Sequence, residues 1–268
     1  MRDISLRALD ALAEADTIAA EDTRDSAHLL THHGITAKRL LALHQHNERG
    51  AANKVIELLA QGQTVALITD AGTPAVSDPG ALVVQEVRAA GYRVIPIPGA
   101  NAAVAALSAA GLVSPHFLFY GFLPNKSAAR CKELHSLMAH PYTLVFYEAP
   151  HRVLESVADL LAVFGGEREI VLAREITKMF ESIHRCRLDA ALDWLNSDPN
   201  NLRGEFVLLV SAAPERAIGL SVEAEHVLKA LLAELPLKQA VQLAVQITGL
   251  AKNELYQKAL ELKNAKPA

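Results

Sequence analysis

The stretch TVALITDAGTPAVSDPG at residues 64–80 constrains the fold of this chain more than any other. It begins with an apolar, β-branched run of the length of a buried strand. The glycines and prolines that follow Asp70 exclude continuation as a strand or a helix. Residues 81–90 then carry valines at the spacing of one helix face. The pattern predicts a strand, a loop and a helix, and such loops are where open α/β sheets bind ligands.

A second loop of the same kind follows. Residues 94–97 are β-branched and are predicted to form a strand that ends at Pro98 and Gly99, and small residues then open a helix to Ala110. Two consecutive loops of small residues let the backbone approach a ligand closely. Turn geometry alone explains the first loop equally well. Neither loop has the GxGxxG or GxxxxGK[ST] pattern, so neither a dinucleotide fingerprint nor a P-loop is expected.

Composition bounds the class of protein. The chain has 268 residues, of which 51% are hydrophobic and 21% charged, so we expect a soluble globular protein with room for two domains. Its net charge of -4 excludes a generally basic surface, and any nucleic-acid contact must be a local patch. Cys131 and Cys186 form no CxxC pair, which fits a reducing cytoplasm. No signal peptide or membrane-length apolar run is found, so we expect a cytoplasmic protein without a membrane partner.

The remaining pattern indicates an α/β fold with a helical tail. We expect an N-terminal α/β domain at residues 1–123, a C-terminal α/β domain with a mixed sheet at 124–213, and a helical tail at 220–268. In the tail, LPLKQAVQLAVQITGLAKNELYQKALEL has the form of a helix-turn-helix with Gly249 in the turn. A helical cap on the second domain is the alternative.

Several strings in the chain resemble a known family. They are AEDTR at residues 20–24, LITDAGTPAVSDPG at 67–80, IPGANAA at 97–103, GFLP at 121–124, FYEAPHR at 146–152, AREITKMFE at 173–181 and GEFVLLV at 204–210. In this order, over nearly the whole chain, they resemble the bacterial ribosomal small-subunit RNA 2′-O-methyltransferase I family. That family is part of the tetrapyrrole methylase superfamily.

The resemblance implies two α/β domains with S-adenosylmethionine in the cleft between them, and a homodimer. It also implies methylation of a cytidine ribose hydroxyl in the decoding region of 16S rRNA, with the small ribosomal subunit and not DNA as the partner. The residues it assigns to the cofactor are Asp70, Ala71, Gly72, Thr73, Pro74, Ser77, Asp78, Gly99, Ala100, Asn101 and Ala102. These are the loops that the residue pattern selects on its own.

The chain departs from the family at its start. Family members begin with a strand and a turn of the type PxxGNL, directly before the helix that starts here at residues 3–5. We expect the first sheet and the cofactor pocket to be incomplete without that strand, since backbone groups of neighbouring strands then lose their partners. There are two explanations. Either the start codon is misassigned and an in-frame strand and turn are encoded upstream, or the gene is a damaged copy.

Catalysis of methyl transfer asks for a group that removes or stabilises the hydroxyl proton. A carboxylate does this, and a lysine does so if burial or positive neighbours lower its pKa. Arg174, Glu175 and Lys178 directly follow a predicted strand and are the candidates, with Glu181 one turn further if the segment is helical. A salt-bridged surface turn explains the same residues equally well.

Four cations are candidates for contact with RNA, namely Arg24, Arg152, Lys238 and Lys252. Arg152 can hold a phosphate or pair with Glu148 across one helical turn, and Arg24 has the same choice with Asp22. No metal is expected, because His44 and His46 lack convincing further ligands nearby.

Three classes of function are compatible with these features. The first is the RNA methyltransferase. The second is a methylase of the same superfamily acting on a tetrapyrrole or a protein, and the third is an inactive RNA-binding remnant. The string AREITKMFE and the helical tail favour the first, because a tetrapyrrole enzyme has no need of a tail that contacts RNA.

Overall fold

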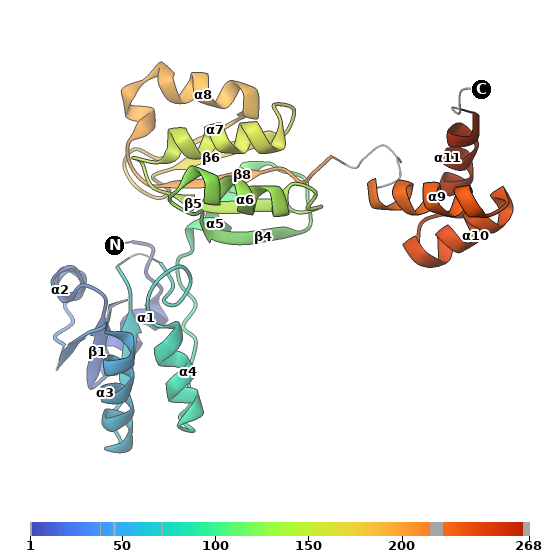
Figure 1. Ribbon diagram of the computed structural model, residues 1–268. Helices are drawn as coiled ribbons and strands as arrows, with labels where there is room; N and C mark the ends of the chain where they lie inside the picture. Colours follow the sequence, from blue (N-terminus) through green and yellow to red (C-terminus); the bar gives the residue numbers. More distant parts are fainter. Residues whose placement is uncertain (1, 38, 45–46, 71, 215–221, 265–268) are drawn as a thin grey trace. The chain divides into compact units, whose positions relative to one another are not determined.

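The computed structural model describes residues 2–37, 39–44, 47–70, 72–214 and 222–264. It consists of two compact units, Met1–Ala212 and Ala213–Ala268 (Figure 1). The larger unit contains two sheets, and the smaller unit is helical. The α/β class and the helical tail are therefore as predicted.

The first sheet has three parallel strands in the order β2-β1-β3. These are β1 (Thr17–Ala20), β2 (Leu40–Ala42) and β3 (Val65–Ile68), with α1 (Leu6–Glu14), α2 (Thr23–His32), α3 (Glu48–Ala60) and α4 (Ala81–Ala89) around them. Successive side chains of a strand point to opposite faces. Accordingly, Ile18 packs with Leu12 of α1 and Leu30 of α2, whereas Ala19 packs with the valines of α3 and α4.

The segment at residues 94–97 belongs to no strand, so the prediction of a strand there is wrong. Its β-branched residues suit a strand, but a strand also needs a hydrogen-bonding neighbour. Among the described strands, β3 pairs with β1 alone, and no ladder reaches residues 94–97. Ile95 is accordingly 60% exposed.

The second sheet has five strands in the order β4-β5-β8-β6-β7. They are β4 (Phe117–Phe122), β5 (Thr143–Glu148), β6 (Glu169–Arg174), β7 (Ser182–Arg187) and β8 (Phe206–Val210). β4 and β5 are parallel, while β8 runs antiparallel to both β5 and β6, so the sheet is mixed as predicted. Its central strands are almost completely buried, which explains their continuous apolar sequence.

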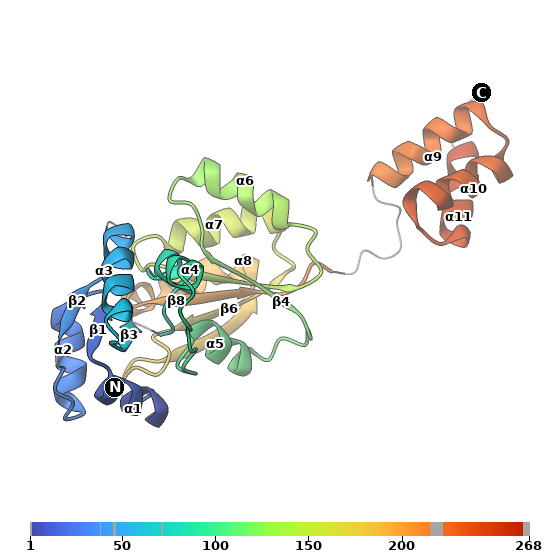
Figure 2. The same ribbon diagram turned by 90° about the horizontal axis from the view of Figure 1, so that it is seen from below.

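Helices cover both faces of this sheet (Figure 2). On one face lie α6 (Ser127–Leu137), α7 (Val153–Phe164) and α8 (Leu188–Ser197), which is followed by the 3₁₀ turn η1 (Pro199–Leu202). On the other face, α5 (Ala102–Ala110) packs its small side chains against Val145, Val171 and Val207. β4 therefore belongs to the second sheet and α5 packs on it, although both lie within residues 1–123, the range predicted for the N-terminal domain.

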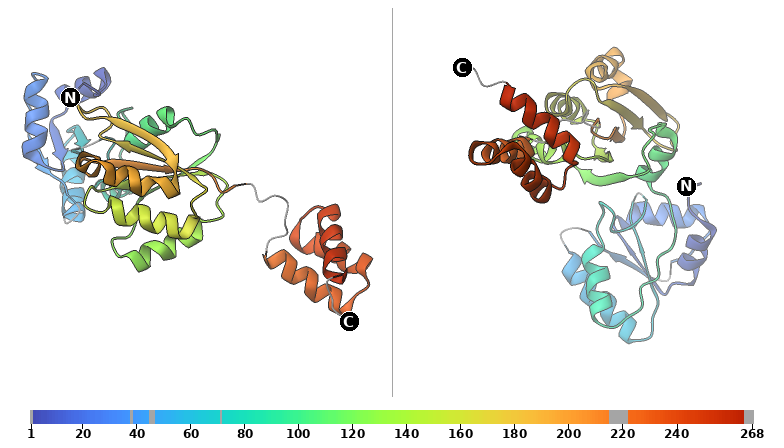
Figure 3. Two further views of the ribbon diagram at one scale, coloured as in Figure 1. Left: turned by 90° about the horizontal axis from the view of Figure 1, so that it is seen from above. Right: turned by 90° about the vertical axis from the view of Figure 1, so that its right-hand side faces the viewer.

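The smaller unit consists of α9 (Val222–Glu234), α10 (Leu237–Thr248) and α11 (Lys252–Asn264) (Figure 3). Leu228, Val241 and Leu255 lie at the centre of its own core. Gly249 ends α10 with φ of 69° and donates its N–H to the Val245 carbonyl at 2.9 Å, as a left-handed helix cap requires. The predicted helix pair with a glycine turn is confirmed. No helix among the described residues is long and apolar enough to cross a membrane.

Candidate active site

The carboxyl ends of β1 and β3 bring acidic residues together. The strands pair in parallel register, Ala20 opposite Ile68, so the residues that follow them meet at one edge. The Asp22 amide donates to Asp70 Oδ1 at 3.2 Å, and the Asp70 amide donates to Glu21 Oε2 at 3.5 Å. The first loop is therefore fixed to β1 through its own first residue.

The two loops selected from the sequence lie side by side. Thr73 Oγ1 donates to the Ala100 carbonyl at 3.0 Å, although the segment before Ala100 is not a strand. Gly72 has φ of 86°, and a Cβ there would stand 3.4 Å from the same carbonyl. Asn101 caps α5 by accepting the Val104 amide at 3.0 Å. A backbone conformation that favours glycine thus lets the loops approach each other.

The rest of the first loop is held in a strained turn. Ala75 and Ser77 have φ of 66° and 63°, left-handed conformations that cost on the order of 1–3 kcal/mol each. The Ala75 amide donates to the Pro79 carbonyl at 3.3 Å, which closes the turn. Glu48 accepts the Gly80 amide at 2.6 Å at the start of α4. Such strain is commonly found at functional sites.

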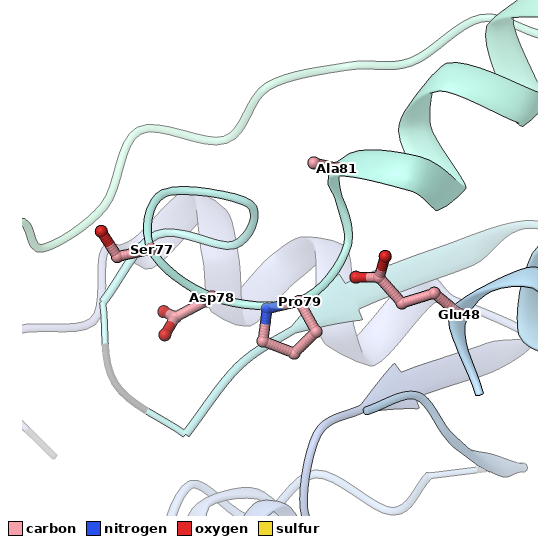
Figure 4. A pocket seen from close by; sticks show the side chains of 5 residues that line it. All are labelled: Glu48, Ser77, Asp78, Pro79 and Ala81. Atoms are coloured by element: carbon pink, nitrogen blue, oxygen red, sulfur yellow. The ribbon is translucent and has the colours of Figure 1, made fainter. Parts of the chain in front are cut away.

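A pocket of about 250 Å³ opens beside this turn (Figure 4). It is lined by Glu48, Ser77, Asp78, Pro79 and Ala81. Ser77 and Asp78 point to the same side of the loop, whereas Glu48 approaches Pro79 from the other side.

The second sheet adds groups to the same place. Gly121 of β4 has φ of 82°, which favours glycine, and a Cβ there would stand 2.9 Å from Ser77 Oγ, so the first loop meets β4 at this residue. On β5, the Tyr147 hydroxyl accepts the Ala103 amide at 3.3 Å, beside the second loop. Sequence reasoning missed both Gly121 and Tyr147 as site residues. The signal was present, since GFLP and FYEAPHR end neighbouring strands of one sheet.

Asp78 has an unusual environment for a carboxyl group. Its burial and the negative charges of Glu21, Asp70 and Glu205 raise its pKa to about 6. Asp78 in turn contributes to a raised pKa of Tyr147, for which burial of the hydroxyl is the main cause. Groups from both sheets therefore interact electrostatically at Asp78.

The cofactor residues implied by the family thus fall into two loops that touch. Asp70, Gly72, Thr73, Pro74, Ser77 and Asp78 lie in the first loop, Gly99, Ala100, Asn101 and Ala102 lie in the second, and Ala71 falls outside the described residues. A Cβ at Gly99 would make ordinary contacts at 3.9 Å with the Ile97 carbonyl and Thr73 Oγ1, and Gly99 is exposed, so a side chain fits there without a clash.

The predicted catalytic residues form a salt-bridged turn after β6. Lys178 Nζ donates to Glu175 Oε1 at 2.9 Å and to Glu205 Oε2 at 2.8 Å. Glu175 has φ of 51° and also accepts the Glu205 amide. Arg174 donates to Ser182 Oγ at 3.1 Å and to the Arg203 carbonyl at 3.3 Å. The segment is not helical, and Glu181 accepts the Thr177 amide.

These ion pairs oppose a role for Lys178 as a base. Burial lowers the pKa of Lys178, but hydrogen bonds to Glu205 and Glu175 outweigh it and raise the pKa. Burial raises the pKa of Glu175, but the Lys178 hydrogen bond and the Glu205 amide outweigh it and lower the pKa. Lys178 therefore stays protonated, and Glu175 is a weak base.

The cations considered for RNA differ sharply in exposure. Arg152 is 14% exposed and pairs with the fully buried Glu148 at 3.2 Å. Its remaining donors bind the Leu123 and Pro124 carbonyls and the Asn125 side chain, so it holds the GFLPN turn. Arg24 is 86% exposed beside Asp22, and its hydrogen bond lowers the pKa of Asp22 to about 2. Lys238 and Lys252 are exposed on the smaller unit.

The described residues contain no group of three or more His, Cys, Asp or Glu side chains that could hold a metal ion. His46, one of the two histidines considered above, lies outside the described residues.

Both parts of the chain match known protein families. Residues 1–192 match the family model described as Tetrapyrrole (Corrin/Porphyrin) Methylases, and residues 219–263 match the RsmI C-terminal HTH domain. The chain is 54% identical to Ribosomal RNA small subunit methyltransferase I of Pseudomonas aeruginosa over 97% of its own length and 92% of that protein. This chain belongs to that family. The Escherichia coli O157:H7 protein of the same name is 49% identical over 97% of this chain and 91% of its own length.

Among solved structures, the methyltransferase CobJ aligns with a TM-score of 0.59 at 22% identity, over 81% of this chain and 92% of that one. This likeness concerns the fold alone.

Family membership makes the chain a methyltransferase that uses S-adenosylmethionine. The residues at the site fit this cofactor. The carboxylates of Glu21 and Asp70 lie at the carboxyl edge of the first sheet, and negative charge suits a cationic sulfonium. Gly99 and Ala100 are exposed, so the backbone of the second loop is accessible to a ligand.

Proposed function

We propose that the chain methylates the 2′-hydroxyl of a cytidine ribose in the 16S rRNA of the small ribosomal subunit. The observation that carries this proposal is the 54% identity to a small-subunit rRNA methyltransferase across both units. The match of residues 219–263 to a helix-turn-helix model supports a macromolecular substrate, since such helix pairs are common in nucleic-acid-binding proteins.

The residues have distinct roles in this proposal. The two touching loops hold S-adenosylmethionine, which supplies a methyl group on a good leaving group when bound. Positioning the ribose oxygen can then supply up to about 7–11 kcal/mol of the barrier. Arg174, Glu175 and Lys178 form a fixed ionic turn that orients the ribose. Arg24, Lys238 and Lys252 bind phosphates, whereas Arg152 acts on the RNA only through the turn that it holds.

A homodimer and a cytoplasmic location complete the proposal. Met179 and Phe180, which are 90% and 67% exposed, adjoin the ionic turn and are the kind of apolar surface that a second subunit covers.

Transfer of labelled methyl groups to purified small subunits tests the proposal. After digestion of the RNA to nucleosides, the label is expected in 2′-O-methylcytidine and in no base-methylated nucleoside. Large subunits serve as the control and are expected to stay unlabelled. Label in a methylated base, or none in small subunits, contradicts the proposal.

A further inference from the structure

Asp78 is the carboxyl group at which elements of both sheets converge. The neighbouring Ser77 meets Gly121 of β4, and the charge of Asp78 acts on Tyr147 of β5. We propose that Asp78 is the catalytic base, and that one of its Oδ atoms accepts the proton of the ribose 2′-hydroxyl. This inference rests on the proposed function and gives Asp78 a part in the chemical step beyond lining the cofactor pocket.

The backbone around Asp78 holds this residue in a defined position. The left-handed conformations of Ala75 and Ser77 and the hydrogen bond from the Ala75 amide to the Pro79 carbonyl form the tight turn that presents Asp78. The side chain lines the pocket and is only half-buried, so a substrate hydroxyl can reach it (Figure 4). A base must lie within hydrogen-bond reach of the proton it removes.

The other candidates lack the properties of a base. Lys178 is held protonated by two carboxylates, and Glu175 has its Oε1 occupied by Lys178 Nζ and the Glu205 amide. Asp70 Oδ1 accepts the Asp22 amide and ties two strand ends together. Asp78 differs from these groups because burial and like charges dominate its surroundings, and the Thr69 hydroxyl only partly opposes them.

The charged groups that face Asp78 explain its affinity for a proton. Glu21 follows β1, Asp70 follows β3, and Glu205 precedes β8, so three elements present carboxylates to it. Glu48 of α3 lines the same pocket, and its carboxylate accepts the Gly80 amide. Lys178 neutralises part of the charge on Glu205. A base whose pKa lies near the working pH is the most efficient proton acceptor.

The step balances without a further reactant. The ribose oxygen forms its bond to the methyl carbon as the bond between that carbon and sulfur breaks. The hydroxyl proton passes to Asp78, and the electron pair of the broken bond stays on sulfur, which leaves as a neutral thioether. Asp78 then releases the proton to water through the open pocket.

The test compares the full-length chain with Asp78→Asn, Asp78→Glu and a control, Asp10→Asn, on the exposed surface of α1. Methyl transfer to small subunits is followed from pH 5 to 9, S-adenosylmethionine affinity by calorimetry, and the Asp78 carboxyl by carbon NMR, assigned by its loss in Asp78→Asn. We expect Asp78→Asn to lower turnover by about 100-fold or more while cofactor affinity stays within about threefold. The rise of the wild-type rate with pH should vanish in Asp78→Asn and persist in Asp78→Glu and Asp10→Asn.

Turnover of Asp78→Asn within about threefold of wild type, or an unchanged pH profile, would overturn the assignment. Loss of cofactor binding in that variant would overturn it as well, since Asp78 would then be a cofactor ligand. Wild-type chain that leaves small subunits unlabelled would defeat the proposed function itself, and the assignment with it. A carboxyl resonance that titrates at the ordinary position for aspartate counts against Asp78 independently of activity.

Discussion

At the scale of single residues, Gly72 and Gly99 lie in touching loops but differ in what a side chain would meet. Gly72 has a left-handed backbone and a carbonyl 3.4 Å from its Cβ position, so any side chain there strains the protein itself. Gly99 has neither restriction, and its nearest neighbours are 3.9 Å away. Gly99 is therefore the cleaner probe of space that a ligand uses.

We predict that Gly99→Val weakens S-adenosylmethionine binding by at least about tenfold, because the added methyl groups fill the space beside the second loop. The free energy of unfolding should change little. Gly50→Val is the matched control, since nothing lies within 4 Å of that Cβ position. Calorimetric titration of both variants checks the prediction. Equal affinities of the two variants for S-adenosylmethionine would contradict it, because the cofactor would then bind to another part of the chain.

The raised pKa of Asp78 also predicts how the stability of the protein depends on pH. Its pKa in the folded protein is raised to about 6 from an ordinary 3.8, mainly by burial. The folded state therefore binds the proton more tightly than the unfolded state, and this contribution to stability is present in acid and disappears as the pH rises through about 6. Asp78→Asn removes the charge, so it should raise the melting temperature at pH 8 and have a smaller effect at pH 4. A variant that melts lower than wild type at pH 8 would contradict this.

At the scale of elements, the pair of Glu148 at the end of β5 and Arg152 before α7 holds the turn after β4. Arg152→Ala leaves the buried carboxylate of Glu148 without its cation, which costs about 3–5 kcal/mol. Arg24→Ala, at a side chain 86% exposed, should leave the free energy of unfolding almost unchanged. Urea denaturation measures both. If Arg152→Ala lowers the free energy of unfolding only slightly, this result contradicts a role in holding the turn, and Arg152 is a free cation for RNA binding.

Individual helices and strands were predicted from the sequence better than the elements with which they pair or pack. The strand run of β3 and the glycine cap at Gly249 follow from local patterns, because burial and backbone conformation act within a few residues. Residues 94–97 show the limit, since a strand depends on a partner that is distant in sequence. The same holds for β4, whose apolar sequence suits either sheet.

The candidate site shows the same difference between local features and contacts that are distant in sequence. Small residues and predicted strand ends selected the two loops, although residues 94–97 form no strand, and the hydrogen bond between Thr73 and Ala100 shows that the loops touch. The pairing of Lys178 with Glu205 and the place of Tyr147 beside α5 join segments far apart in the chain. Spacing along the sequence carries no information on such contacts.

At the scale of the whole molecule, the helical unit has its own core and presents exposed lysines at the starts of α10 and α11. We predict that Lys238→Glu with Lys252→Glu weakens binding to small subunits and flattens its salt dependence by about one unit of slope for each phosphate that is no longer neutralised. Cofactor affinity should be unchanged. The control is Lys229→Glu, whose lysine already pairs with Glu225 at 2.9 Å. Unchanged subunit binding in the double variant would leave the unit a structural role.

Our central claim is that the loops after β3 and before α5 form one cofactor site. Hydrogen exchange of the full-length chain, measured with and without S-adenosylmethionine, tests it most directly. We predict that the cofactor slows exchange in residues 72–80 and 99–104, together with the end of β5 at Tyr147. Protection confined to the turn at residues 175–181 or to the helical unit, with both loops exchanging as before, would contradict it.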